Sequence, residues 1–266
     1  NGELLPPEMF YGRRREREEV QKTTGTCFIY GGRQLGKTAL LHEVRHRVHE
    51  PAFGRVALYV DLRAHGIGYP HGPDRIWHKL AERLAEHKVV PNALPSNIRG
   101  DTLLRHVEEW LSESLDRRVL LLLDEADKFL EADSQDGFVR CAEIKGAMER
   151  TGRRFKVVFS GLHNVLRSTR QANHPLAHFG TPICIGPLFQ DGEWREARSL
   201  AERPLASLGY RFESPDLVMR MLSQVNFYPS LIQLYCDHLL SYMAEVRSGG
   251  NEPGPPFIIR ERHLDA

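Results

Sequence analysis

The clearest chemical pattern in the chain runs from Gly31 to Thr38. This stretch matches G-x-x-x-x-G-K-[ST] at every fixed position. Glycines let backbone N–H groups turn toward phosphate oxygens, and a following helix aims its positive dipole end at the same anion. Lys37 would reach the β- and γ-phosphates, and the Thr38 hydroxyl would ligate Mg²⁺. The pattern predicts a phosphate-binding loop, or P-loop, whose members are Gly31, Gly32, Arg33, Gln34, Leu35, Gly36, Lys37, Thr38 and the adjoining Ala39.

A second candidate group is the acidic pair Asp124 and Glu125, which directly follows the apolar run 119–123. A phosphate loop needs a carboxylate on a neighbouring strand to hold Mg²⁺, and ligands of open α/β sheets bind at the carboxyl ends of the strands. Asp124 would hold the metal, and Glu125 would act as general base toward the attacking water. The alternative interpretation is that both acids only cap a following helix.

Three further polar residues are weaker candidates. Ser160 ends the apolar run that begins at Phe155, where a hydroxyl can touch the γ-phosphate or the attacking water. Arg167 and Arg170 follow and could stabilise transition-state charge. A strand-end polar residue and a solvated helix face are the competing interpretations.

His42-Glu43-Val44-Arg45-His46 matches the H-E-x-x-H signature of zinc proteases. The helix that would carry it is the one that leaves the P-loop, and its first turn is committed to phosphate. We therefore interpret the two histidines as part of a solvent-facing helix side and predict no zinc site.

The elements that must position these residues alternate between two patterns. Short apolar runs typical of strands buried on both faces are followed by longer helical periodicities, which predicts an α/β fold with a parallel sheet and right-handed crossovers. The five expected strands are Thr26–Tyr30, Arg55–Asp61, Val119–Asp124, Phe155–Ser160 and Pro182–Leu188. The expected helices are Thr38–His49, Pro73–His87, Asp101–Ser114 and Ala142–Arg150, then Glu193–Leu208, Ser214–Val225 and Pro229–Val246.

This order predicts three regions. Residues 1–190 would form the nucleotide-binding α/β core with its N-terminal lead-in, and 191–247 a small all-helical lid. Residues 248–266, which are rich in Gly and Pro, would be a linker toward a further domain. Because the chain also starts without Met, we expect it to be a module of a larger protein.

The composition limits which classes of partner and which compartment we expect for this protein. The 36 Lys and Arg against 35 Asp and Glu give a net charge of +1, without the basic excess typical of proteins that coat nucleic acid. The four cysteines form no C-x-x-C pair, and no apolar run reaches the roughly 18 residues of a membrane span. We expect a reduced, cytoplasmic protein that does not enter a membrane.

Together these motifs resemble the AAA+-related P-loop ATPases, and more closely their STAND and archaeal-type ATPase branch. Phe10–Glu16 is similar to the F-x-G-R-x-x-E segment that precedes the P-loop in that branch and helps enclose the adenine. Ile185–Leu188, with the helix from Glu193, is similar to the transition from strand to lid. Phe227–Ile232 lies where the branch carries G-x-P near the nucleotide, although Phe227 replaces the glycine.

The resemblance implies a three-layer P-loop NTPase fold with a five-stranded parallel sheet and a helical lid. It also implies that Gly12, Arg13 and Pro229 lie near a bound adenine nucleotide, ATP or ADP, with Mg²⁺ as the metal. Members of the STAND branch are switches that exchange ADP for ATP, regulate attached effector or sensor domains, and often form homo-oligomers.

Three functions therefore stay open. The chain could be a slowly hydrolysing ATP switch module of a regulatory, signalling or defence protein. It could be a DNA-associated ATPase resembling origin-recognition or transposition ATPases, although no basic surface or winged helix indicates DNA. It could also be a nucleotide-dependent scaffold with little hydrolysis, against which Glu125 counts.

Overall fold

The computed structural model describes residues 6–162, 180–248 and 254–264. Its described residues form two compact units. The core unit comprises 14–32 and the described part of 37–184. The C-terminal unit comprises the described parts of 1–13 and 185–266, together with 33–36. The candidates Arg167 and Arg170 lie outside the described residues.

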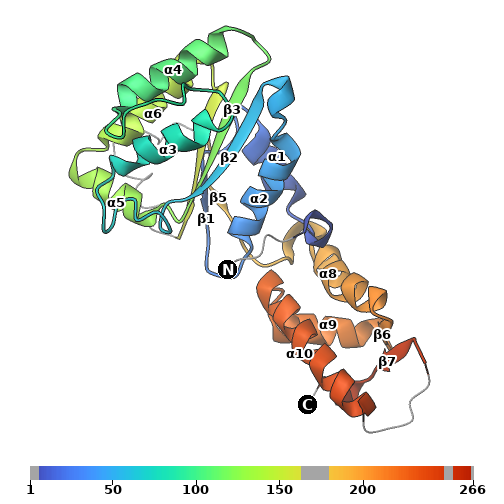
Figure 1. The fold of residues 1–266 in the computed structure, drawn as a ribbon. Coiled ribbons are helices and arrows are strands. Elements are labelled where there is room, and N and C mark those ends of the chain that lie inside the picture. Colours follow the sequence, from blue (N-terminus) through green and yellow to red (C-terminus); the bar gives the residue numbers. More distant parts are fainter. Residues whose placement is uncertain (1–5, 163–179, 249–253, 265–266) are drawn as a thin grey trace. The chain divides into compact units, whose positions relative to one another are not determined.

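The core unit is built on a five-stranded sheet in the order β2-β3-β4-β1-β5, and every neighbouring pair is parallel (Figure 1). The strands are β1 (Phe28–Tyr30), β2 (Arg55–Asp61), β3 (Arg118–Asp124), β4 (Phe155–Gly161) and β5 (Ile183–Cys184). Strand β4 is buried along its whole length, as expected for a strand of a parallel sheet that is covered on both faces. The predicted α/β class and five-stranded parallel sheet are confirmed.

Helices cover both faces of this sheet and give three layers (Figure 1). Helices α1 and α2 lie on one face, and α3, α4 and α6 lie on the other. The helices of the core unit are α1 (Arg14–Gln21), α2 (Lys37–Val48), α3 (Arg75–Ala85), α4 (Gly100–Ser112), α5 (Asp127–Gln135) and α6 (Val139–Arg150).

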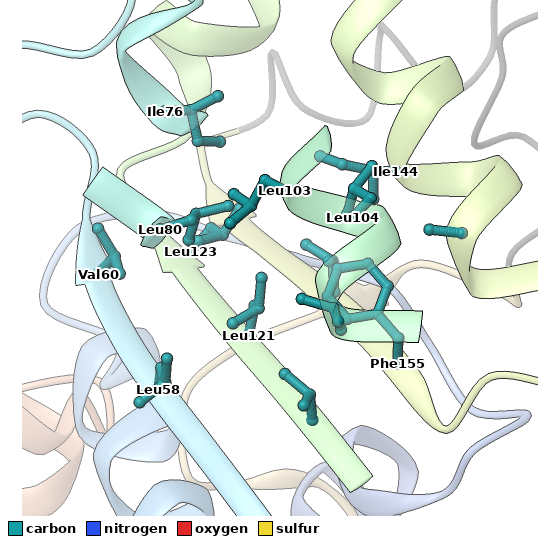
Figure 2. Close-up of a cluster of buried hydrophobic side chains, with 14 of the residues drawn as sticks. Leu58, Val60, Ile76, Leu80, Leu103, Leu104, Leu121, Leu123, Ile144 and Phe155 are labelled. Atoms are coloured by element: carbon teal, nitrogen blue, oxygen red, sulfur yellow. The ribbon is translucent and has the colours of Figure 1, made fainter. Parts of the chain in front are cut away.

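The main hydrophobic core lies between the sheet and the second helix layer. Figure 2 shows Leu121 and Leu123 of β3 beside side chains of the covering helices, among them Leu80 of α3 and Leu104 of α4. Alternate residues of each strand face this layer, since side chains along a strand point to opposite faces. The strand residues between these core positions face the opposite side of the sheet, toward α2. Tyr59, between Leu58 and Val60, is one of them.

A buried lysine ties α1 to the central strand. Lys156 of β4 is only 3% exposed, and its ammonium donates to the backbone oxygen of Val20 at 2.8 Å and to that of Lys22. These carbonyls lie at the C-terminal end of α1, where a cation is favourable. Burial lowers the pKa of Lys156 to about 8.

The C-terminal unit contains three long helices, as expected, and also strands. The helices are α8 (Trp194–Ser207), α9 (Pro215–Gln224) and α10 (Pro229–Ser248), and 3-10 turns η1 (Pro7–Met9), η3 (Gln190–Gly192) and η4 (Glu261–His263) accompany them. Strand β6 (Tyr210–Phe212) pairs in parallel with β7 (Phe257–Ile259). The predicted helical lid is confirmed in its three helices, and the structure adds two strands. Each strand is only three residues long and leaves no readable pattern in the sequence.

The described part of 248–266 also differs from the expected linker. Phe257, Ile259 and Leu264 are buried in the core of the C-terminal unit, and the Tyr235 hydroxyl donates to the Leu264 carbonyl at 2.9 Å. Residues 254–264 therefore belong to this unit, because they supply one of its two strands and part of its core. The structure divides the chain at residue 185 rather than 190, and residues 6–13 belong to the C-terminal unit.

Within the described ranges, no helix has the length and apolar character that crossing a membrane requires.

The packing of β3 gives a stability prediction. Leu121→Ala should lower the free energy of unfolding by about 2–5 kcal/mol, because Leu121 is fully buried and its truncation leaves a cavity. Leu115→Ala is the matched control, since Leu115 is 81% exposed just before the same strand. Urea denaturation measures both variants, and equal midpoints for the two would contradict the described core.

Candidate functional site

The P-loop connects the end of β1 at Tyr30 to the start of α2 at Lys37. Gly36 has φ +87° with open space where a Cβ would lie, so its glycine is required by conformation rather than by crowding. Gln34 also has a positive φ of 64°. Lys37 is buried, and its Nζ donates to the backbone oxygens of Gly31 at 3.0 Å and Gly32 at 2.7 Å. The loop thus places the Lys37 ammonium at the N-terminus of α2. The positive charge and the N–H groups at this helix end both favour binding of an anion.

Asp124 is the centre of the core unit's polar cluster. It is 1% exposed at the end of β3, and its Oδ2 accepts hydrogen bonds from the Thr38 hydroxyl at 2.7 Å and the Tyr59 hydroxyl at 3.2 Å. Its Oδ1 accepts from the backbone N–H of Glu125 at 3.0 Å. The two predicted motifs therefore meet directly.

Tyr59 is a member of this cluster that sequence reasoning missed. It is the single aromatic residue of the strand Arg55–Asp61 and lies between aliphatic residues, which is the signal that could have identified it. Burial and the Asp124 carboxylate raise the pKa of the Tyr59 phenol, so it stays protonated and donates.

Thr38 and Asp124 fit Mg²⁺. Both offer hard oxygen atoms, and these lie 2.7 Å apart. Magnesium usually takes only one or two carboxylates from the protein and completes its octahedron with waters and substrate phosphates. The Thr38 hydroxyl and the Asp124 carboxylate supply this small number of protein ligands beside the P-loop.

The H-E-x-x-H sequence is engaged in other contacts. The His42 ring packs on Tyr59 with centroids 4.0 Å apart, and Glu43 pairs with Arg17 at 3.3 Å and with Arg47. Burial and the neighbouring Arg45 lower the pKa of His42. Across 6–162, 180–248 and 254–264, no cluster of three or more His, Cys, Asp or Glu is arranged to hold a metal ion.

Glu125 follows Asp124 directly and is partly exposed. Its backbone is left-handed at φ +52°, a conformation that costs a non-glycine residue about 1–3 kcal/mol. Its side chain is 40% exposed, and its Oε2 lies 3.9 Å from the Arg63 guanidinium. Partial burial, with the carboxylates of Asp124 and Asp61, raises the pKa of Glu125. A carboxylate with raised proton affinity is suited to accept a proton from water.

Ser160 lies on β4, beside Ile29 of β1 in the sheet register. It is fully buried, and its hydroxyl has no hydrogen-bond partner among the residues that the structure describes. A buried hydroxyl without a partner is unfavourable by about 1–3 kcal/mol. A hydrogen bond to the γ-phosphate or to the attacking water, as predicted for Ser160, would give this hydroxyl a partner.

The residues carried over from the flanking motifs belong to the C-terminal unit. Gly12 has φ +74°, and a Cβ there would come within 3.0 Å of Leu188. The Arg13 guanidinium contacts Glu193 at 3.3 Å and the carbonyl of Leu35 at 3.3 Å, and also donates to the Gly186 carbonyl. Pro229 is the first residue of α10. Contact of Gly12, Arg13 or Pro229 with a nucleotide stays a prediction, since these Arg13 partners are protein groups.

Fold and cluster together define the class of the protein, a P-loop ATPase of the AAA+ type. A family model described as AAA domain matches residues 20–168, which is more than half of the chain, and the chain belongs to this family. A comparison with curated proteins found no match.

Several solved structures share the fold. The Walker-type ATPase of Pyrococcus abyssi has a TM-score of 0.64 at 14% identity, over 91% of this chain and 69% of that one. The Aeropyrum pernix ORC2 protein in its ADPNP–ADP complexes gives 0.60 at 16%, over 94% and 66%. The ORC1 protein of the same organism, in complex with DNA, gives 0.54 at 18%, over 98% and 66%. This chain thus spans about two thirds of each.

The Asp124 cluster generates a prediction for Tyr59. Tyr59→Phe removes one of three donors to a buried carboxylate, and we expect it to lower the free energy of unfolding by about 1–2 kcal/mol. Tyr69→Phe is the control, because Tyr69 is exposed in the same unit. Chemical denaturation measures both. A Tyr59→Phe variant as stable as the control would show that the hydroxyl does not support Asp124.

Proposed function

We propose that the chain binds ATP with Mg²⁺ at the P-loop and hydrolyses it slowly. The observation that carries this proposal is the 2.7 Å hydrogen bond between Thr38 and Asp124, which joins the two motifs across 86 residues of sequence. A glycine-rich turn alone would not bring a hydroxyl and a buried carboxylate together at the start of its helix.

Each residue of the site then has a chemical task. The N–H groups of the loop and the Lys37 ammonium would bind the phosphate oxygens, and Thr38 and Asp124 would hold Mg²⁺. When bound, the metal supplies positive charge against the triphosphate. Glu125 would accept a proton from the attacking water, and the Ser160 hydroxyl would orient that water or the γ-phosphate.

The finer part of the proposal is that the module acts as a switch in a larger cytoplasmic protein. Three cysteines are buried as free thiols, consistent with a reducing compartment. The C-terminal unit includes residues 33–36 of the P-loop, so contacts within that unit can depend on the nucleotide. Attached effector domains and nucleotide-dependent homo-oligomers are part of the same proposal.

A DNA-associated ATPase is the second candidate, and the fold shared with ORC1 in its DNA complex favours it. The net charge of +1 weighs against it, because proteins that bind nucleic acid usually carry an overall basic excess. Duplex DNA that binds at physiological salt and accelerates ATP turnover would support this candidate over the switch.

Nucleotide binding should depend on Lys37. Lys37→Ala removes the charge that faces the β- and γ-phosphates, so affinity for Mg-ATP should fall at least tenfold, or about 1.4 kcal/mol. Lys22→Ala is the control, since Lys22 is exposed at the end of α1. Isothermal titration calorimetry measures the Mg-ATP affinity of both variants. Unchanged affinity in a folded Lys37→Ala variant would contradict the P-loop assignment.

Binding and hydrolysis should separate at Glu125. Glu125→Gln keeps the shape but loses the base, so ATP should bind normally while turnover drops roughly 10²-fold or more. Glu131→Gln, an exposed acid on α5, is the control. If turnover survives in Glu125→Gln, another residue activates the water.

The pH profile gives an independent check of that role. The base must be deprotonated to accept a proton, so turnover of the wild type should decline on acidification as Glu125 becomes protonated. Residual turnover of Glu125→Gln should lack this acid limb.

A further inference from the structure

Two successive carbonyls of the P-loop are held by side chains of the C-terminal unit. The Gln34 carbonyl accepts a hydrogen bond from the Ser230 hydroxyl at 3.0 Å, and the Leu35 carbonyl accepts one from the Arg13 guanidinium at 3.3 Å. Ser230 lies at the start of α10, and Arg13 precedes α1. Donors from opposite ends of the sequence therefore meet at neighbouring peptides of one loop.

The geometry of the peptide bond gives these contacts a consequence for phosphate. In a trans peptide, the carbonyl of one residue and the N–H of the next point in opposite directions. The cis peptides of the described chain lie elsewhere, at Tyr69-Pro70 and Pro255-Pro256. Holding the Gln34 carbonyl to one side of the loop turns the Leu35 N–H to the other, and holding the Leu35 carbonyl does the same for the Gly36 N–H.

We propose that Arg13 and Ser230 are positioning residues that orient the N–H groups of Leu35 and Gly36 toward bound phosphate. The inference rests on the proposed nucleotide binding, and it assigns Arg13 to the loop backbone in place of a direct nucleotide contact. Neither residue touches the phosphate. Both act by fixing peptide planes that would otherwise have to be ordered when the nucleotide binds.

The way Arg13 itself is held supports this role. Its side chain is 5% exposed, and Glu193 engages it twice, through the backbone N–H at 2.6 Å and the guanidinium at 3.3 Å. Its backbone has φ +58°, and a Cβ on Gly12 before it would lie only 3.0 Å from the Leu188 side chain. Such strain persists only where surrounding contacts over-determine it. A guanidinium fixed in this way presents its donors to the loop in one geometry.

The experiment compares Arg13→Ala, Arg13→Lys and Ser230→Ala with two controls. Arg198→Ala removes a half-exposed arginine of α8 that pairs with Glu202, and Ser223→Ala removes an exposed hydroxyl that bonds within α9. The readouts are the ¹⁵N and ¹H amide resonances of Leu35 and Gly36 in the free protein, and the affinity for Mg-ATP by calorimetry.

We expect the Leu35 resonance to shift in Ser230→Ala and the Gly36 resonance to shift in the Arg13 variants, with both controls unchanged. Mg-ATP affinity should fall about tenfold in Arg13→Ala and about threefold in Ser230→Ala, because ordering the freed peptides then opposes binding. Arg13→Lys keeps the charge but not the planar set of donors, so it should restore little. Millimolar guanidinium should partly restore the affinity of Arg13→Ala.

Unchanged resonances and affinity in folded Arg13→Ala and Ser230→Ala would overturn the inference, even while the wild type binds ATP. Failure of the wild type to bind Mg-ATP would instead refute the proposed function, and the amide resonances of the free variants would still test the positioning contacts. If Arg13→Ala does not fold, Ser230→Ala still tests the inference. This variant removes only one hydroxyl and is expected to fold.

Discussion

The buried carboxylate of Asp124 imposes the strictest condition on this structure. A charge removed from water must be compensated by donors of good geometry, or the group becomes protonated instead. Its three donors come from three places, the first turn of α2, the strand β2 and the peptide after β3. The start of α2 and the register of β2 against β3 are therefore coupled at one point, which is also where the chemistry would occur.

Strained backbone occurs in both units. Gln34 in the P-loop and Glu125 after β3 both have left-handed conformations that ordinary residues avoid, and so does Arg13 in the C-terminal unit. Each is surrounded by contacts that hold it, from the Ser230 hydroxyl at Gln34 to the Glu193 carboxylate at Arg13. Stability supplied by the packed sheet is thus used to keep a few residues in unfavourable conformations.

The sheet and the motif residues could be predicted because their patterns are local. Strand β2 begins and ends at the predicted residues, and the P-loop and acidic pair are contiguous in sequence. Other features arise only in three dimensions. Tyr59 becomes a partner of Asp124 through the alternation of β2, and Arg13 finds the Leu35 carbonyl through tertiary packing. Strands β6 and β7 escaped notice because three residues are too few to show a period.

The sheet order has a consequence for how the chain is made. Strand β1 is synthesised first among the strands, yet its partners in the sheet are β4 and β5, and Phe28 pairs in register with Phe159. During translation β1 must therefore wait, unpaired, while β2 and β3 emerge and find each other. Such non-local pairing slows folding, and a waiting apolar strand invites association with other chains. That β1 has only three residues keeps this exposed edge short, a common protection against aggregation of nascent chains.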